Sequence, residues 1–275
     1  ATGATPVFAD IDRVTYNLDP KSINWLLTSR TKVVLPVDVF GVVAPVQAIK
    51  QVLADNGRED VHVLSDSMEA MGAKYPDGTS VGSKSVGGTF GFYPNKQVCT
   101  CHGGVFYTDD EELALKVRKM RHHGFITGGL EAQAFGFNVR MSDPLAAMGL
   151  VQLKKLPEKQ EKLRRVAQYY EKHLPLATQR PVDGAVKAEF IMVVEVDGGR
   201  DEVASKLAKV GIPTRPYFVP LVTLKHLANC TTDIGCAVAL QVARRTLALP
   251  FYPDMTEDEV KTVSQKVMQV LRGQI

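Results

Sequence analysis

The sequence predicts an α/β fold in which a larger part is built on a mostly parallel sheet and a smaller C-terminal part is α+β. Over residues 7–64, apolar runs of strand length alternate with stretches of helical spacing, a pattern typical of parallel strands joined by helices. The run Val61–Leu64 is followed closely by the lone carboxylate of Asp66, as at the tip of a buried parallel strand that faces a site. A long helical pattern over residues 142–174 then separates the two parts.

Signals at strand and helix ends place the elements of the first part. Asp19 can cap a helix that has Pro20 at its first position and ends near Ser29. Pro36 and Asp38 make the second strand less regular than the others. The expected strands are Val7–Ala9, Lys32–Phe40, Val61–Leu64, Phe90–Phe92 and Gly104–Tyr107, and the further helices are Val46–Asp55 and Glu111–Arg121.

A glycine-rich loop over 124–137 leads into the long helix, for which Ser142 is a good cap. We expect Pro157 to kink or divide this helix, because proline removes a backbone donor and clashes with the preceding turn. The helix ends a large domain, predicted over 1–174, and links it to a small domain over 175–275. The small domain is expected to hold strands at Phe190–Val196, Pro213–Phe218 and Thr246–Pro250, and helices at Asp201–Val210, at Cys236–Arg245 and from Thr256 onward.

Composition limits the setting of the protein. The net charge of +3 is spread over mixed signs, so no basic stripe indicates a nucleic-acid partner. No window approaches 18 uninterrupted apolar residues, so we expect no membrane span. Four cysteines are too few for a secreted disulfide scaffold, and we expect a soluble, cytoplasmic protein. Because the chain starts with Ala1 and almost inside an element, we also expect that the front of a longer protein is absent.

One lysine and one carboxylate stand at the ends of neighbouring predicted strands. Lys96 follows the aromatic segment 90–93, and Asp66 lies thirty residues earlier with several glycines between them. A pyridoxal phosphate enzyme needs this pair of groups. The lysine holds the cofactor aldehyde as a Schiff base, and the aspartate keeps the ring nitrogen protonated so that the ring accepts electrons.

Several motifs, in order along nearly the whole chain, resemble those of the DegT/DnrJ/EryC1/StrS aminotransferase family. The segment 65–73 is similar to its Glu-Asp-Ala-Ala-Gln-Ala-x-Gly-Ala motif, and Phe92-Tyr-Pro-Asn-Lys96-Gln to its lysine motif. Other matching segments are Met120-Arg-His-His-Gly124, Phe137-Asn138-Val-Arg140-Met141, Gly211-Ile-Pro-Thr-Arg215-Pro and Leu247-Ala-Leu-Pro250. The resemblance implies fold-type I, pyridoxal 5'-phosphate as cofactor and a homodimer with shared active sites. It also implies amino transfer, commonly from glutamate, to a keto-sugar attached to a nucleotide.

The resemblance assigns a role to five residues. Lys96 would form the Schiff base and move the substrate proton, and Asp66 would pair with the pyridinium nitrogen. Glu69 stands where a glutamine usually contacts the ring hydroxyl. Asn138 would reach the phosphate of the neighbouring subunit's cofactor, and Arg140 would bind an anionic substrate group.

The chain departs from the family pattern at several of these places. Gly91 replaces a serine that usually binds the cofactor phosphate, and Glu69 replaces an amide with a carboxylate. Val222 replaces a histidine that is often near the substrate, and the loop Cys99-Thr-Cys101-His102 replaces a Thr-Thr-Gly-Glu pattern. These departures concern cofactor affinity and sugar preference, while the pair of Lys96 and Asp66 is intact.

Other interpretations of the same residues stay open. A lysine after a strand is commonly a solvated surface residue, and Asp66 alone could cap a helix. The cysteines at 99 and 101 could bind a metal or be small buried thiols. Asn138 and Arg140 could stabilise a turn or a dimer contact.

Two other functions remain as alternatives to amino transfer. A related class of enzymes dehydrates sugars on the same scaffold, but it typically has a histidine in place of the lysine, so Lys96 argues against it. A degenerate, non-catalytic member that serves as a binding or regulatory protein is favoured by Gly91 and by the absent front.

Overall fold

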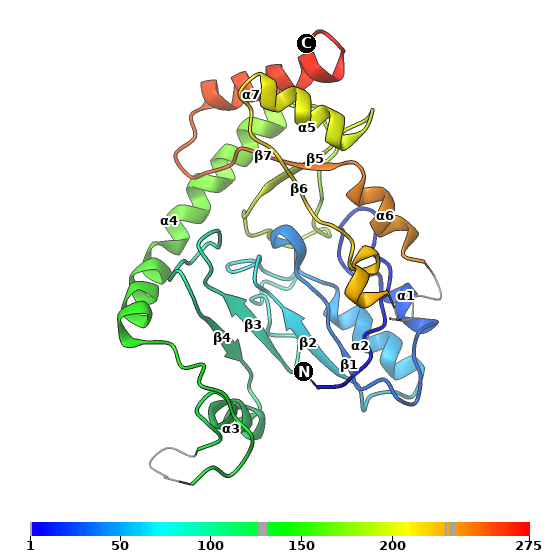
Figure 1. The fold of residues 1–275 in the computed structure, drawn as a ribbon, viewed down its shortest axis with the longest axis vertical. Coiled ribbons are helices and arrows are strands. Elements are labelled where there is room, and N and C mark those ends of the chain that lie inside the picture. Colours follow the sequence, from blue (N-terminus) through cyan, green and yellow to red (C-terminus); the bar gives the residue numbers. More distant parts are fainter. Residues whose placement is uncertain (1, 126–130, 229, 231–234) are drawn as a thin grey trace.

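The computed structural model describes residues 2–125, 131–228, 230 and 235–275. Two sheets organise this part of the chain, one of four strands in the order β1-β2-β3-β4 and one of three strands in the order β5-β7-β6. Figure 1 shows the first sheet in the lower half of the molecule and the second above it, with α4 running along one side of both. The expected α/β fold with a smaller α+β unit is confirmed, and the domain boundary at residue 174 stays a prediction.

The first sheet is parallel except at one edge. Strands β1 (Val33–Val34), β2 (His62–Asp66) and β3 (Gly87–Gly91) run parallel, and β4 (Gly104–Tyr107) pairs antiparallel with β3. In the register of β2 and β3, Asp66 pairs with Thr89. The carboxyl ends of β2 and β3 therefore lie at the same edge of the sheet, which is where parallel sheets place ligands.

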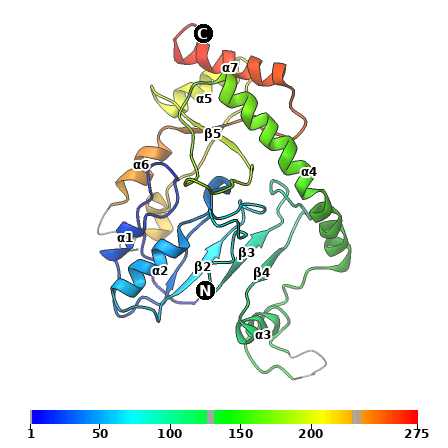
Figure 2. The same ribbon diagram turned by 180° about the vertical axis from the view of Figure 1, so that it is seen from behind.

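Helix α2 (Val46–Asp55) packs its apolar stripe against the first sheet. Val46, Ile49 and Leu53 are buried with Val63 of β2, because residues three and four apart share one face of a helix. Figure 2 shows α2 beside the short α1 (Pro20–Asn24), and α3 (Glu111–Met120) at the lower end of the molecule.

Three expectations for the first part need correction. No strand forms at Val7–Ala9. Helix α1 is capped by Asp19 as predicted but ends at Asn24, well before Ser29. The predicted strand 32–40 shrinks to Val33–Val34, because Pro36 cannot donate to a ladder and the chain turns into a 3-10 helix at Val39–Gly41.

Helix α4 (Asp143–His173) is continuous through Pro157, so the expected division of this helix is wrong. Pro157 lies on the exposed side of the helix, where water can bond the carbonyl that proline leaves without a donor. The C-terminal half of α4 is held by its apolar face, since Leu163, Val166 and Tyr170 are buried. Residues 126–130 of the predicted glycine-rich loop lie outside the described residues.

The second sheet has its own core. Strand β7 (Thr246–Leu249) pairs antiparallel with β5 (Met192–Glu195) on one side and β6 (Arg215–Pro216) on the other. One face of this sheet packs against α4, α5 (Arg200–Lys209) and α7 (Glu257–Leu271). The remaining elements are α6 (Ala237–Ala243) and the 3-10 helices Leu221–Thr223 and Lys225–Leu227. Among the described helices, none combines the length and the apolar character needed to span a bilayer.

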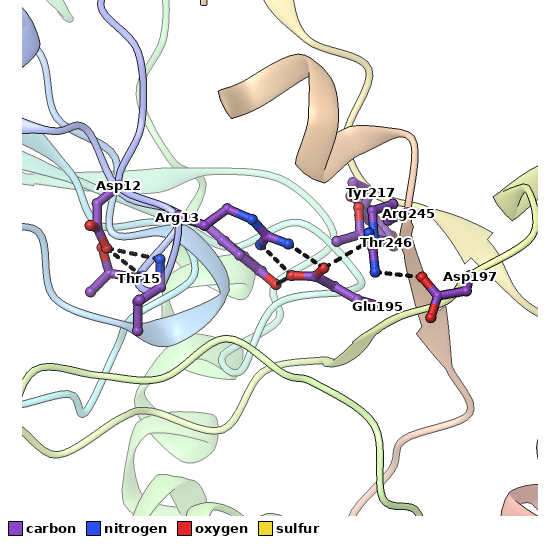
Figure 3. A network of polar contacts seen from close by, with 10 residues as sticks. Asp12, Arg13, Thr15, Glu195, Asp197, Tyr217, Arg245 and Thr246 are labelled. Carbon is purple, nitrogen blue, oxygen red and sulfur yellow. Dashed lines mark hydrogen bonds and ion pairs between the residues drawn. The ribbon is translucent and has the colours of Figure 1, made fainter. Parts of the chain in front are cut away.

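A polar network joins the start of the chain to the second sheet. Figure 3 shows Arg13 and Glu195 pointing toward one another, with both guanidinium ends of Arg13 donating to the two carboxylate oxygens of Glu195. The Tyr16 hydroxyl also donates to Glu195, and Arg245 lies 3.4 Å from the same carboxylate. The Arg13 guanidinium holds the pKa of Glu195 below its usual range. The contacts connect segments about 180 residues apart and fix the first segment against β5.

Candidate active site

The Lys96 amine lies inside the protein beside a carboxylate. Its Nζ atom is 3.3 Å from Oε1 of Glu69, and the two side chains are only 14% and 9% exposed. The ammonium also lies 4.8 Å from the centre of the Phe190 ring, within the range of a cation–π contact. Lys96 is therefore not the solvated surface lysine of the alternative interpretation.

Glu69 is held at its carboxylate and at its backbone carbonyl. Its second carboxylate oxygen accepts a hydrogen bond of 3.0 Å from the Phe40 N–H, and its backbone carbonyl accepts one of 2.6 Å from the Gln97 side chain. The turn that presents the Phe40 N–H requires a glycine next to it. Gly41 has φ +91°, and a Cβ there would overlap the carbonyl oxygen of Ala188. Glu69 thus has one carboxylate oxygen fixed by the chain and the other turned to the Lys96 amine.

Asp66 ends β2 and is half-buried. Its Oδ1 atom accepts a 3.1 Å hydrogen bond from the Met68 N–H, so the carboxylate sits in a turn and does not cap a helix. The backbone N–H of Asp38 donates to the Asp66 carbonyl at 2.9 Å. The strand end that carries Asp66 leads within three residues to Glu69, and Glu69 contacts Lys96. Three of the five predicted residues therefore belong to one edge of the first sheet.

The sequence analysis missed a buried carboxyl group behind this edge. Asp38 is fully buried and accepts 2.6 Å hydrogen bonds from the Ala44 N–H and the Ser67 hydroxyl. Among the described residues it forms no ion pair. Burial raises the pKa of Asp38 to about 6. The Ser67 hydroxyl is also 2.8 Å from that of Tyr107. The signal available in the sequence is an aspartate within an apolar run, a pattern that indicates an irregular strand as readily as a buried carboxyl group.

Gly91 and Met68 form a matched pair at the end of β3. A Cβ at Gly91 would lie 3.2 Å from the Met68 sulfur and 3.4 Å from two of its carbons, which is a tight contact. The Met68 side chain therefore lies against the position where the resemblance expects a serine hydroxyl. In this chain that position has no side chain to offer a phosphate, and a neighbouring thioether fills part of the space.

Asn138 and Arg140 lie apart from Lys96 and Glu69. Both are exposed, in the segment between α3 and α4, where Asn138 forms an antiparallel bridge with His122. Arg140 lines a cavity of about 820 Å³ against β4 and α3. Neither residue contacts Lys96 within this chain, so their predicted role toward a neighbouring subunit's site stays a prediction.

The four cysteines are all free thiols. Cys99 and Cys101 lie in the loop before β4, and the Cys101 N–H contacts the Cys99 sulfur at 3.5 Å. Within the part of the chain that the structure describes, no three His, Cys, Asp or Glu side chains are grouped so that they could hold a metal ion.

Two sheets, with a largely shielded lysine beside the carboxylate of Glu69 and with Asp66 at the end of β2, are the arrangement expected of an aminotransferase of fold-type I. The family model described as the DegT/DnrJ/EryC1/StrS aminotransferase family matches residues 1–268. The chain belongs to this family. The expected family, fold type and enzyme class are therefore confirmed.

Relatives and solved structures agree with this assignment. The chain is 33% identical to the spore coat polysaccharide biosynthesis protein SpsC of Bacillus subtilis, over 99% of this chain and 75% of that protein. It is also 33% identical to GDP-perosamine synthase of Caulobacter vibrioides, over 98% of this chain and 74% of that enzyme. Its fold is similar to the crystal structure of DesI in the presence of its TDP-sugar product, with a TM-score of 0.88 and 30% identity over 98% of this chain and 70% of that one.

Proposed function

We propose that the protein is a pyridoxal phosphate-dependent aminotransferase that converts a nucleotide-linked keto-sugar to an amino-sugar, with glutamate as the amino donor. The observation that carries the proposal is the Lys96 amine, which is shielded from solvent and held by Glu69 at 3.3 Å. The substrate class is supported by the names of two similar proteins, a GDP-perosamine synthase and DesI with a TDP-sugar product.

The residues present fit the reactive end of the cofactor. Lys96 offers an amine to its aldehyde, and Asp66 offers a half-buried carboxylate to its ring nitrogen. Glu69 would lie beside the ring hydroxyl. The fit is weaker at the phosphate, since Gly91 offers only its backbone. When bound, the cofactor supplies an electron sink that makes the α-proton of an amino acid labile.

The chain's own residues position and move the proton in this proposal. The Lys96 Nζ atom takes the proton from the α-carbon of the donor and returns it within the same half-reaction. Glu69 holds that amine in place through a carboxylate that is itself fixed by the Phe40 N–H. The Phe190 ring lies 4.8 Å from the same amine, within the range of a cation–π contact. The keto-sugar then accepts the amino group by the same steps in reverse.

Asn138 and Arg140 belong to the proposal through a second copy of the chain. Both are exposed, and the apolar neighbours Phe135, Val139 and Leu150 are 76%, 64% and 63% exposed. An apolar surface of this kind is typical of a protein–protein interface. We propose a homodimer in which this segment reaches the partner's site, which light scattering of the purified protein tests directly.

The enzyme proposal is tested by trapping the lysine. Purified protein mixed with pyridoxal phosphate should gain a visible absorbance band, and borohydride should then fix a mass adduct on the peptide that contains Lys96. Lys96→Ala should abolish both signals, whereas Lys154→Ala, at an exposed position of α4, should keep them. A wild-type protein without band and adduct would contradict the proposal.

A specific observation favours the non-catalytic alternative. The Met68 side chain lies against Gly91, where the family pattern has a phosphate-binding hydroxyl. If this contact prevents cofactor binding, Met68→Ala combined with Gly91→Ser should form the adduct that the wild type lacks. An adduct of equal yield in both proteins would remove this argument for a binding or regulatory role.

A further inference from the structure

Two cysteines lie close together in the loop that carries Lys96. This loop connects β3 to β4, and Cys99 and Cys101 follow the lysine within five residues. Cys101 is exposed and Cys99 is half-buried, so the interpretation of both as small buried thiols is wrong. The Thr-Thr-Gly-Glu pattern of the family has no cysteine in this segment, so the pair is a feature of this chain.

The sulfur of Cys99 is turned toward Cys101. It accepts the N–H of Cys101 at 3.5 Å, and a side chain that bonds the backbone two residues further on closes a turn. Even in a fully extended chain, α-carbons two residues apart are separated by at most about 7 Å. A disulfide needs them roughly 4.4–6.8 Å apart. The spacing and the turn therefore permit a bond between the two sulfurs, once the exposed Cys101 side chain changes its rotamer.

The backbone around Cys101 is held in an unusual turn. The His102 N–H donates to the Thr100 carbonyl at 2.8 Å, across Cys101, whose φ is +66°. A turn of this kind with a side chain at positive φ is rare and strained, and it persists only where its surroundings fix it. Here Thr100 is fully buried, and its N–H donates to the Phe92 carbonyl at 3.0 Å. The fold thus keeps both cysteines on either side of one fixed residue.

The same loop is connected to the candidate active site. The buried Gln97 side chain donates to the Glu69 carbonyl at 2.6 Å, and the Lys159 amine donates to the Gln97 carbonyl at 2.9 Å. Gln97 lies between Lys96 and Cys99 in the chain. A bond between the two thiols would therefore restrict a segment whose other end holds the lysine.

We propose that Cys99 and Cys101 form a redox modification site, which hydrogen peroxide converts reversibly to a disulfide. Cys101 reacts first, because oxidation of a thiol follows its exposure. Its sulfur attacks one peroxide oxygen, the O–O bond breaks, water leaves and a sulfenic acid forms. The Cys99 sulfur then attacks the Cys101 sulfur, the S–O bond breaks and a second water leaves. Two thiols have then lost two electrons and two protons, and one peroxide has become two waters.

The disulfide should also be easy to reduce. It is exposed and closes a short ring, and exposed or strained disulfides are the labile ones. We therefore expect a thiol reductant to restore both cysteines. The proposal is independent of the proposed aminotransferase function, since it concerns only the two thiols and an oxidant from solution.

Mass spectrometry of the peroxide-treated protein tests the site. Trypsin cleaves after Lys96 and Lys116, so both cysteines lie on one peptide, 97–116. After oxidation and alkylation of the remaining thiols, this peptide should be unalkylated and lighter by two hydrogen atoms, and dithiothreitol should restore it. The matched control is Cys230→Ser, because Cys230 is also a half-buried free thiol. This variant should form the same disulfide as the wild type.

Two further variants separate the roles of the thiols. In Cys99→Ser, the sulfenic acid at Cys101 has no thiol to resolve it, so dimedone, which traps sulfenic acids, should label it at least about fivefold more than in the wild type. In Cys101→Ser, the remaining half-buried Cys99 should be labelled little.

Three outcomes would overturn the proposal. The first is a wild-type peptide 97–116 that peroxide leaves unchanged. The second is a peptide that gains oxygen atoms and is not restored by dithiothreitol. The third is stronger labelling of Cys99 in Cys101→Ser than of Cys101 in Cys99→Ser. The first two are measured on the wild type, so a variant that fails to fold does not remove the test.

Discussion

A single carboxylate at position 69 gives the Lys96 amine its position. The family pattern has an amide there, which could accept the Phe40 N–H equally well through its oxygen. The amide would then turn its NH₂ group toward the lysine, and two donors do not attract. The carboxylate instead accepts a hydrogen bond from the Lys96 Nζ atom at 3.3 Å, and this contact has to break before the amine attacks an aldehyde. Glu69 thus makes the resting lysine well ordered and less reactive.

Substitution of Glu69 by glutamine should therefore speed the reaction of Lys96 with pyridoxal phosphate. We expect the borohydride-trapped adduct to form roughly three- to tenfold faster, because the contact between the Lys96 Nζ atom and the carboxylate no longer has to break first, and this factor corresponds to about 1 kcal/mol. The matched control is Glu158→Gln, because Glu158 also lies 3.3 Å from a lysine but is 72% exposed, and its partner is Lys162 and not Lys96. Slower or unchanged trapping in Glu69→Gln would show that the carboxylate does not restrain the amine.

The buried Asp38 carboxyl makes folding stability depend on pH. The sign is opposite to that of a carboxylate in a salt bridge, because stability falls as the pH rises. Burial raises its pKa to about 6, above that of an unfolded aspartate. Between about pH 4 and pH 6 the folded protein binds a proton that the unfolded chain does not, so stability falls as the pH rises through this window. The full effect, from about two pKa units, is at most ~3 kcal/mol.

Asp38→Asn should remove this pH dependence. The asparagine oxygen can still accept the Ala44 N–H, and its amide can donate to the Ser67 hydroxyl, so the packing is preserved. Urea unfolding measures the free energy of unfolding at pH 5 and at pH 8. Between these two pH values, the variant should lose less of this free energy than the wild type. Glu59→Gln, at an exposed position, should behave as the wild type, and a parallel pH response in Asp38→Asn would contradict the argument.

The site residues show what sequence reasoning can and cannot find. Lys96 and Asp66 were predicted because each follows an apolar strand, and their distinctive residue types mark the strand ends. The burial of Asp38 and the Met68–Gly91 contact were not predicted, because both arise from segments that meet only in the folded chain. The Glu69–Lys96 ion pair was also beyond the sequence, which placed Glu69 near the cofactor ring and not beside the amine.

At the scale of elements, the predicted limits are correct where local signals mark both ends. Helix α2 and strand β4 have the predicted limits, since a helical stripe and glycine ends are local features. Ser142 precedes α4 as expected, but its side chain makes no capping bond, whereas Thr256 forms a capping box with Glu259. Strand β1 is shorter than its apolar run because strand length depends on a partner strand, which the run itself does not specify.

The long helix α4 offers a test of how proline is tolerated. Pro157 interrupts the hydrogen-bond ladder in the middle of the helix, whereas Pro144 lies in its first turn, where no donor is needed. Pro157→Ala should therefore stabilise the protein by about 1–3 kcal/mol, measured by urea unfolding. Pro144→Ala should change the free energy of unfolding by less than about 0.5 kcal/mol. Equal effects of the two changes would mean that α4 has already relaxed around Pro157.

At the scale of the whole molecule, the network around Glu195 connects segments that local patterns cannot relate. Arg13 and Tyr16 precede the first helix, and Glu195 ends β5 in the second sheet. Nothing in the sequence near residue 13 indicates a partner about 180 residues away. The two cores, by contrast, follow from apolar periodicity within each part. The arrangement of the parts relative to one another is thus the feature least accessible from sequence.

Glu195→Gln should show how much this connection contributes to stability. The substitution keeps the side-chain shape and an acceptor for Tyr16 but removes the charge that Arg13 binds, so we expect a loss of about 2–3 kcal/mol in urea unfolding at pH 7. The pKa of Glu195 is held below its usual value, chiefly by Arg13. Its contribution is therefore complete above the unfolded pKa and disappears as the pH falls through the lower, folded one.

The difference between wild type and Glu195→Gln should accordingly be largest near neutral pH and shrink in acid. Asp197→Asn is the matched control, because Asp197 accepts a 2.6 Å hydrogen bond from Arg245 in the same network but is 87% exposed, and exposed pairs contribute about 0–1 kcal/mol. Two outcomes would contradict this argument: an equal loss of stability in both variants, or a loss in Glu195→Gln that does not change with pH. Either would mean that the buried carboxylate does not bind the first segment to the second sheet.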